Sequence, residues 1–166
     1  MNSRRLQVRV VRKFQEGWLC AEAVAGSVLE HLGLESQPEL RRAISAFNYG
    51  LGGTGLEHCG AFTGGVLALG VLFGRDQPDL ELRVLKTEIE NYRRWFIETF
   101  GTLSCSELRD SFGETKESEC GSLSVQAVVW LSHRIEQRQP AVKVGDFNDQ
   151  SRLRVKLGQC PFASHS

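Results

Sequence analysis

The chain has 166 residues, and its 20 basic and 20 acidic side chains give a formal net charge of zero at pH 7. This balance argues against a nucleic-acid-binding protein and against binding to an anionic membrane, since both functions favour a strongly basic surface. The apolar content of 41% and the charged content of 24% are typical of a soluble globular protein. One domain is predicted over 1–140, followed by a partly ordered C-terminal tail over 141–166.

The cysteine content is the next informative feature, because the chain contains five cysteines. No long apolar segment follows the basic N-terminus, so no signal peptide is expected, and the longest apolar stretch is too short to span a bilayer. These features predict a cytoplasmic protein without membrane insertion. In a reducing compartment, several cysteines indicate redox chemistry or metal binding rather than structural disulfides.

Apolar residues recur at helical spacing through most of the chain, which predicts an all-α fold. Helices are predicted over about 8–32, from Pro38 onward, and over about 57–73, 78–100, 104–113 and 118–137. The glutamates along these helices, Glu88 among them, are predicted to be solvated. The only candidate strand lies at 153–157. The sequence therefore predicts a compact bundle of about five or six helices around the helix at 57–73.

The helix predicted over 57–73 is apolar on nearly every side, which indicates a central and buried position. Its small residues are Gly60, Ala61, Gly64, Gly65, Ala68 and Gly70. Each glycine lowers helix stability by up to about 1 kcal/mol relative to alanine. We therefore expect neighbouring helices or loops to approach this helix closely.

A glycine-rich loop precedes this central helix, and residues 50–55 match the pattern G-x-G-x-x-G. In a dinucleotide-binding protein this pattern follows a strand and opens a helix within a parallel sheet. Here an amphipathic helix precedes it and no parallel strands follow. We interpret the loop as a tight turn that brings the backbone close to a cysteine site.

Three of the cysteines, Cys59, Cys105 and Cys120, fall at predicted helix N-termini, whereas Cys20 falls inside the first predicted helix. Unpaired N–H groups and the positive end of the helix dipole favour a thiolate at such positions. Cys59 is expected to be the most acidic thiol, because its helix is long and the glycine loop can direct free N–H groups at its sulfur. His58 either supports that thiolate as an imidazolium or is an exposed cap residue.

The cysteines do not form a local motif, because no Cys-x-x-Cys occurs among them. Thioredoxin-like and zinc-ribbon sites therefore lack their usual sequence signature. Any site that combines the cysteines must be assembled by tertiary structure from separate helices.

Cys20, then Cys59-Gly60-Ala61-x-x-Gly64, and then Cys105 and Cys120 together resemble the pattern of the C_GCAxxG_C_C family of redox-active proteins. The resemblance covers about 14–136 and implies that the four family cysteines are Cys20, Cys59, Cys105 and Cys120. His58 stands where a small polar residue, often threonine, is expected. Cys160 lies outside the pattern and receives no role.

The leading hypothesis is a thiol-based redox protein in which Cys59 is the nucleophile and another family cysteine closes a disulfide with it. This hypothesis requires no cofactor. If the protein is an enzyme, the hypothesis predicts a thiol–disulfide oxidoreductase, and the sequence does not identify its thiol substrate or redox partner. The alternative is a zinc or iron–sulfur protein that uses the same four cysteines as ligands. A third hypothesis is a structural or partner-binding helical domain whose cysteines are vestigial. The sequence is compatible with a homodimer. It also does not decide among the three ways in which four cysteines can form two disulfides.

Overall fold

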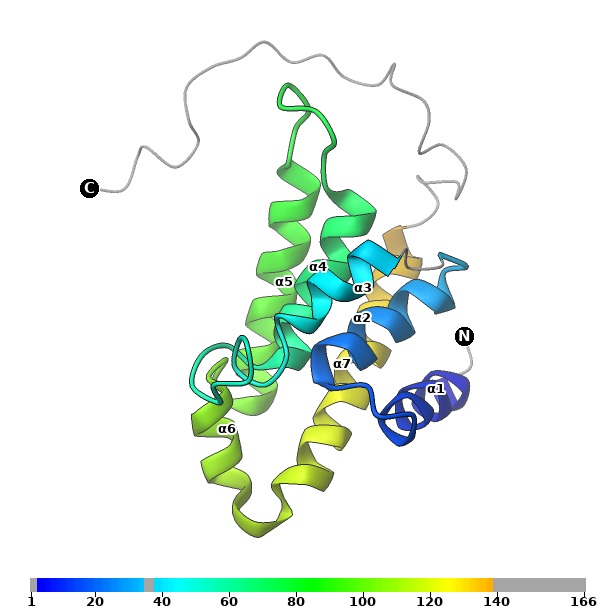
Figure 1. Cartoon of the computed structure of the whole chain (residues 1–166). Coiled ribbons are helices and arrows are strands. Elements are labelled where there is room, and N and C mark those ends of the chain that lie inside the picture. Colours follow the sequence, from blue (N-terminus) through cyan, green and yellow to red (C-terminus); the bar gives the residue numbers. More distant parts are fainter. Residues whose placement is uncertain (1–2, 35–37, 139–166) are drawn as a thin grey trace, which may run out of the picture.

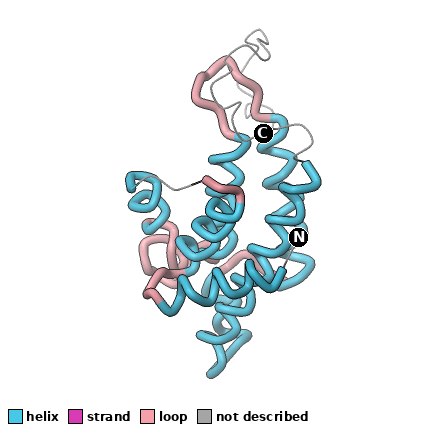
Figure 2. The backbone as a smooth tube through the Cα atoms, turned by 90° about the vertical axis from the view of Figure 1, so that its right-hand side faces the viewer, coloured by secondary structure: helices cyan, strands magenta, loops and turns pink. Residues whose placement is uncertain are grey.

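A computed structural model describes residues 3–34 and 38–138, and these residues form helices joined by loops without a strand (Figures 1 and 2). In chain order the helices are α1 (Ser3–Gln15), α2 (Cys20–His31), α3 (Pro38–Ser45), α4 (Gly60–Phe73), α5 (Arg83–Phe100), α6 (Cys105–Phe112), the 3-10 turn η1 (Gly113–Thr115) and α7 (Lys116–Arg138). The predicted all-α fold is therefore confirmed. The predicted tail over 141–166, with Cys160 and the candidate strand, lies outside the described residues.

The single helix predicted over 8–32 is wrong, because two helices, α1 and α2, occupy this region. Gly17 has a φ of +91°, a left-handed conformation that interrupts the helix and that glycine adopts at little cost. The periodic stripe also misplaced two side chains, since Val11 is 47% exposed and Trp18 is 36% exposed. The break places Cys20 at the first position of a helix instead of in a helix interior.

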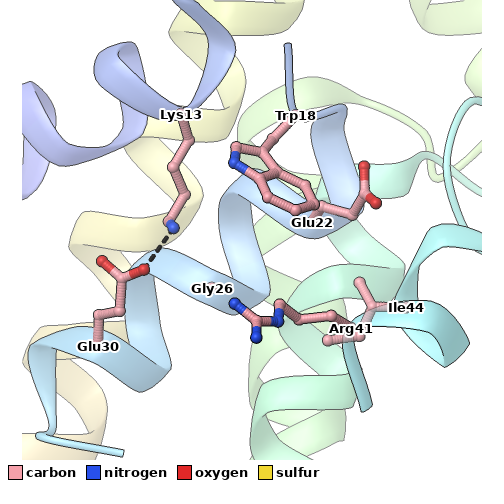
Figure 3. A pocket seen from close by; sticks show the side chains of 7 residues that line it. All are labelled: Lys13, Trp18, Glu22, Gly26, Glu30, Arg41 and Ile44. Atoms are coloured by element: carbon pink, nitrogen blue, oxygen red, sulfur yellow. Dashed lines mark hydrogen bonds and ion pairs between the residues drawn. The ribbon is translucent and has the colours of Figure 1, made fainter. Parts of the chain in front are cut away.

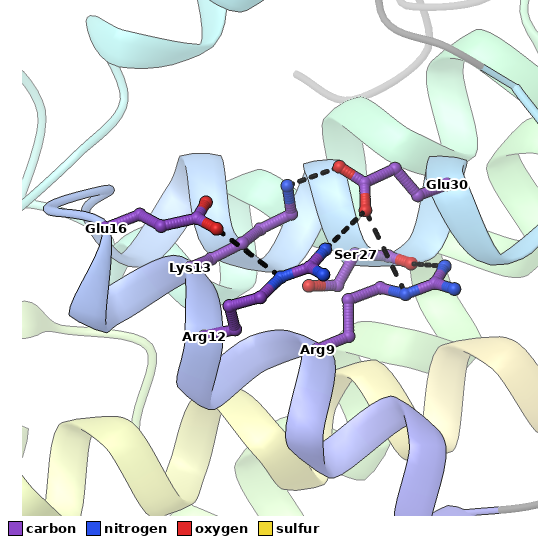
Figure 4. A network of polar contacts seen from close by, with 6 residues as sticks. All are labelled: Arg9, Arg12, Lys13, Glu16, Ser27 and Glu30. Atoms are coloured by element: carbon purple, nitrogen blue, oxygen red, sulfur yellow. Dashed lines mark hydrogen bonds and ion pairs between the residues drawn. The ribbon is translucent and has the colours of Figure 1, made fainter.

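An ion-pair network holds α1 against α2 (Figure 4). The carboxylate of Glu30 accepts a hydrogen bond from Lys13 and lies 3.9 Å from both the Arg9 and the Arg12 guanidinium groups. Gly26 leaves room for this arrangement, because a Cβ atom there would lie 3.1 Å from Cε of Lys13. Arg9, Arg12 and Lys13 thus share one carboxylate, whose single negative charge offsets only part of their positive charge.

The glycine-rich helix α4 occupies the centre of the bundle and contacts α2, α5 and α7 (Figure 1). A Cβ atom on Gly64 would lie 2.5 Å from the backbone oxygen of Ala21, and one on Gly65 would overlap the ring of Tyr92. The predicted close approach is therefore confirmed at these two positions. It does not extend to Gly70, where nothing lies within 4 Å of an added Cβ atom.

An aromatic cluster fixes the first turn of α4 against α5 and α7. Tyr92 of α5 is fully buried, and its hydroxyl donates a hydrogen bond of 2.9 Å to the backbone oxygen of Ala61. The Tyr92 ring lies 5.4 Å from the rings of both Phe62 and Trp130, measured between centroids. These contacts matter for the site because they hold the helix turn that follows Cys59.

A second contact between α5 and α7 is ionic. Glu88 is only 1% exposed, so the prediction that it is solvated is wrong. Its carboxylate lies 2.7 Å from the Arg134 guanidinium and 2.6 Å from that of Arg138. The two arginines supply the partners that a buried carboxylate requires.

No helix within the described ranges is both long and apolar enough to cross a membrane.

Candidate functional site

The glycine loop forms an unusual left-handed turn directly beside Cys20. Every residue from Tyr49 to Gly53 has a positive φ, with values from 47° to 81°. Tyr49 and Leu51 are not glycines, and a left-handed conformation costs such residues about 1–2 kcal/mol each. The turn places the Tyr49 N–H 3.5 Å from the Cys20 sulfur. The loop therefore approaches a thiol as predicted, but this thiol belongs to Cys20 and not to Cys59.

Cys20 is the half-buried first residue of α2, and its sulfur lies against Gly60, where an added Cβ atom would overlap it. Leu19 precedes the helix and has no polar side chain to cap it. Asn48 supplies the missing cap from another segment, because its Oδ1 accepts a 2.8 Å hydrogen bond from the Ala21 N–H and lies 4.0 Å from the Cys20 sulfur. The sequence analysis did not identify Asn48, since its role depends on a tertiary contact.

Cys59 and Cys105 are brought together by a short antiparallel bridge between His58 and Ser104. The N–H of Cys59 and the N–H of Cys105 each donate a 2.7 Å hydrogen bond to a carbonyl of the opposite segment. The bridge therefore places the starts of α4 and α6 side by side. The Ser104 hydroxyl also caps α6 by accepting the N–H of Glu107 at 3.3 Å.

Burial governs the acidity of Cys59, which is 8% exposed, and raises the pKa of its thiol from 9.0 to about 12. The backbone N–H groups of Ala61 and Phe62 at the start of α4 lower the pKa, whereas the charges of Cys20 and Cys105 raise it further. The predicted helix-terminus effect thus exists and has the predicted sign. Desolvation outweighs it, so the prediction that Cys59 is the most acidic thiol is wrong.

Cys105 and Cys120 are also less acidic than free cysteine. Burial is the largest cause that raises the pKa of each thiol, and the positive charge of Arg109 lowers both. For Cys120 the charge of Arg109 is the largest cause that lowers the pKa. Cys120 lies in the second turn of α7, which begins at Lys116, so the prediction that it opens a helix is wrong.

Cys20 links the four cysteines electrostatically, because its charge acts on the thiols of Cys59, Cys105 and Cys120. All four thiols are free. Within 3–34 and 38–138, no three or more histidine, cysteine, aspartate or glutamate side chains are grouped so that they could hold a metal ion.

Two other features near the cysteines are separate from them. His58 is exposed and its ring stacks 6.0 Å from that of Phe62, as expected for a cap residue. A pocket between α1, α2 and α3 is lined by Lys13, Trp18, Glu22, Gly26, Glu30, Arg41 and Ile44, without a cysteine (Figure 3). Its two carboxylates already have protein partners, Lys13 for Glu30 and Asn48 for Glu22.

The fold and the site define an all-α protein in which free cysteines from α2, α6, α7 and the start of α4 lie within electrostatic range of Cys20. The sequence profile of the family described as "Putative redox-active protein (C_GCAxxG_C_C)" matches residues 18–134. The chain belongs to this family, as the resemblance predicted. No curated protein and no solved structure gives a significant match.

The raised pKa of Cys59 predicts a loss of stability at alkaline pH. Its thiol keeps its proton up to about pH 12 in the folded chain but ionises near 9.0 in the unfolded chain. The neutral Cys59 thiol therefore makes its full contribution to the free energy of unfolding below about pH 9. As the pH rises toward 12, this contribution falls by about 1.4 kcal/mol per pH unit. Denaturant unfolding between about pH 8 and 11 should show a shallower decline for Cys59→Ala than for the wild type. Equal slopes would contradict the buried, neutral thiol.

Proposed function

We propose that the protein performs dithiol–disulfide exchange at this cysteine cluster, with Cys20 as the attacking thiol. The observation that carries the proposal is the central position of Cys20, whose charge acts on each of the other three thiols. Membership in a family described as redox-active supports the same class of chemistry. The assignment replaces Cys59 as the nucleophile.

Access supports this choice, because an external disulfide must reach the attacking sulfur. Cys59 and Cys105 are 8% and 6% exposed, whereas Cys20 and Cys120 are only half-buried. Cys20 also accepts the Tyr49 N–H and begins a helix, two features that accommodate negative charge on a sulfur. Cys120 is then the accessible neighbour that can resolve a mixed disulfide.

The exchange has two steps that balance in atoms and electrons. The Cys20 thiolate attacks one sulfur of a substrate disulfide, so a mixed disulfide forms and the other substrate sulfur leaves as a thiolate, which takes up a proton. Cys120 then loses its proton, and its thiolate attacks the Cys20 sulfur and releases the second substrate thiolate. The protein dithiol is oxidised to a Cys20–Cys120 disulfide, and the substrate disulfide is reduced to two thiols.

Cys59 and Cys105 form a second, buried dithiol in this proposal. Their raised pKa values make them slow to attack, and the bridge between their segments keeps them close to each other. They therefore stay reduced while the first pair exchanges with the substrate, and they form a second disulfide only under more oxidising conditions.

Anaerobic purification, followed by metal analysis and thiol counting on one sample, tests the proposal. We expect metal-free protein that loses thiols in pairs when a small disulfide is added, with release of two substrate thiols per pair lost. Metal in a fixed ratio to protein, with thiols that resist the disulfide until the metal is removed, would contradict the proposal and favour the metal-binding alternative.

A further inference from the structure

Arg109 is a charged residue of α6 that contacts three separate parts of the cysteine site. Its guanidinium carbon lies 4.7 Å from the centroid of the Tyr49 ring, and one of its nitrogens lies 3.5 Å from a carboxylate oxygen of Glu117. Glu117 lies one helical turn before Cys120 on α7, so this ion pair places Arg109 beside Cys120, and the positive charge of Arg109 lowers the pKa of that thiol. The Arg109 side chain is only 19% exposed, so the protein encloses most of it.

These contacts are more than a surface ion pair. The side chain of Glu117 is 72% exposed, and such an exposed ion pair contributes little to stability. The planar face of arginine can stack on an aromatic ring while its edge keeps N–H donors for other groups. Tyr49 therefore orients the guanidinium, and the edge of the guanidinium is available to the Cys120 sulfur.

We propose that Arg109 is a positioning residue for the exchange reaction, which orients the Cys120 sulfur and stabilises its thiolate for attack on the Cys20 mixed disulfide. The inference rests on the proposed function. Tyr49 links the two thiols, because its ring carries Arg109 while its N–H donates to Cys20. One aromatic residue in the left-handed turn thus connects the attacking thiol with the group that assists the resolving thiol.

The charged groups that act on Cys120 come from three helices. Arg109 and Cys105 belong to α6, Glu117 belongs to α7 itself, and Cys20 belongs to α2. Arg109 is the one cation among them and favours the thiolate, whereas the negative charges of Cys20 and Glu117 oppose it. Removing Arg109 and removing the charge of Glu117 should therefore shift the reactivity of Cys120 in opposite directions.

The test is the pH dependence of Cys120 alkylation in fully reduced protein, with substoichiometric iodoacetamide and peptide mass analysis. Arg109→Gln should slow Cys120 labelling about tenfold at pH 7 and move its pH profile upward by about one unit, because a tenfold smaller thiolate fraction corresponds to one pKa unit. Arg109→Lys should label at a rate between those of the wild type and Arg109→Gln, since lysine keeps the charge and loses the planar stack. Glu117→Gln should speed labelling about twofold.

Arg93→Gln is the matched control, because Arg93 is an exposed arginine that pairs with Glu90 at 3.8 Å on α5. It should leave the Cys120 profile unchanged. Equal profiles for Arg109→Gln and the wild type, or shifts of the same sign for Arg109→Gln and Glu117→Gln, would overturn the inference. The labelling assay needs no disulfide to form, so it can reject the role of Arg109 without rejecting the proposed exchange. If Arg109→Gln does not fold, the labelling rate of Glu117→Gln still tests that role.

Discussion

Gly60→Ala is expected to lower the free energy of unfolding by about 1–3 kcal/mol, the usual cost of overpacking a well-filled core, and to disrupt the cysteine site. The added Cβ atom would overlap the Cys20 sulfur and would lie 3.2 Å from the Ala21 nitrogen. Rotation of the sulfur can relieve the first contact but not the second. A rotated sulfur would also lose the Tyr49 N–H, so Cys20 alkylation should change along with stability.

Gly70→Ala is the matched control, because Gly70 lies in the same helix with nothing within 4 Å of an added Cβ atom. This substitution should raise stability by about 0.5–1 kcal/mol, since alanine favours a helix interior over glycine. Denaturant unfolding of both variants measures whether each substitution lowers or raises the free energy of unfolding. A stable Gly60→Ala variant with unchanged Cys20 labelling would contradict the close contact between α2 and α4.

Cys20→Ser is expected to have the largest effect on chemistry, because every step of the proposed exchange passes through the Cys20 sulfur. The variant should lose the fast phase of thiol oxidation by a small disulfide, and Cys120 should remain a free thiol. Serine is nearly isosteric, so the fold should remain. The reaction with the disulfide is stopped at a series of times with a thiol label, and peptide mass analysis then measures which cysteines have been oxidised.

Cys160→Ser is the comparison for this experiment, because Cys160 lies outside the family pattern at 18–134. It should keep the fast phase and the pairwise loss of thiols. A Cys20→Ser variant that oxidises like the wild type would show that another thiol attacks the substrate. The assignment of Cys20 would then be wrong, although the cluster itself could still be redox-active.

Much of the fold follows from apolar periodicity and small residues. The central, buried position of α4 and its close contacts at Gly64 and Gly65 were predictable, because a helix that is apolar on all sides and rich in glycine needs near neighbours. The break in the helix at Gly17 was not predictable, since the apolar stripe continues across this residue. Periodicity reports which residues are apolar, whereas one left-handed glycine decides whether the helix continues.

The candidate site shows a different limit. The sequence suggested which cysteines belong together, but it could not rank their acidity. For Cys59 the local N–H groups of the helix start were predictable, whereas the burial that raises its pKa to about 12 depends on helices distant in sequence. Asn48 and Arg109 act on Cys20 and Cys120 from other segments, and their spacing in the sequence carries no motif.

Equilibrium redox titration of the wild-type protein tests the central claim most directly. The protein would be equilibrated in glutathione buffers across roughly −320 to −180 mV, trapped with a thiol label and mapped by peptide mass. We predict a reversible two-electron transition in which the first disulfide to form joins Cys20 to Cys120, while Cys59 and Cys105 stay reduced longer. Four thiols that remain free across the whole range, or a first disulfide that omits Cys20, would contradict the account.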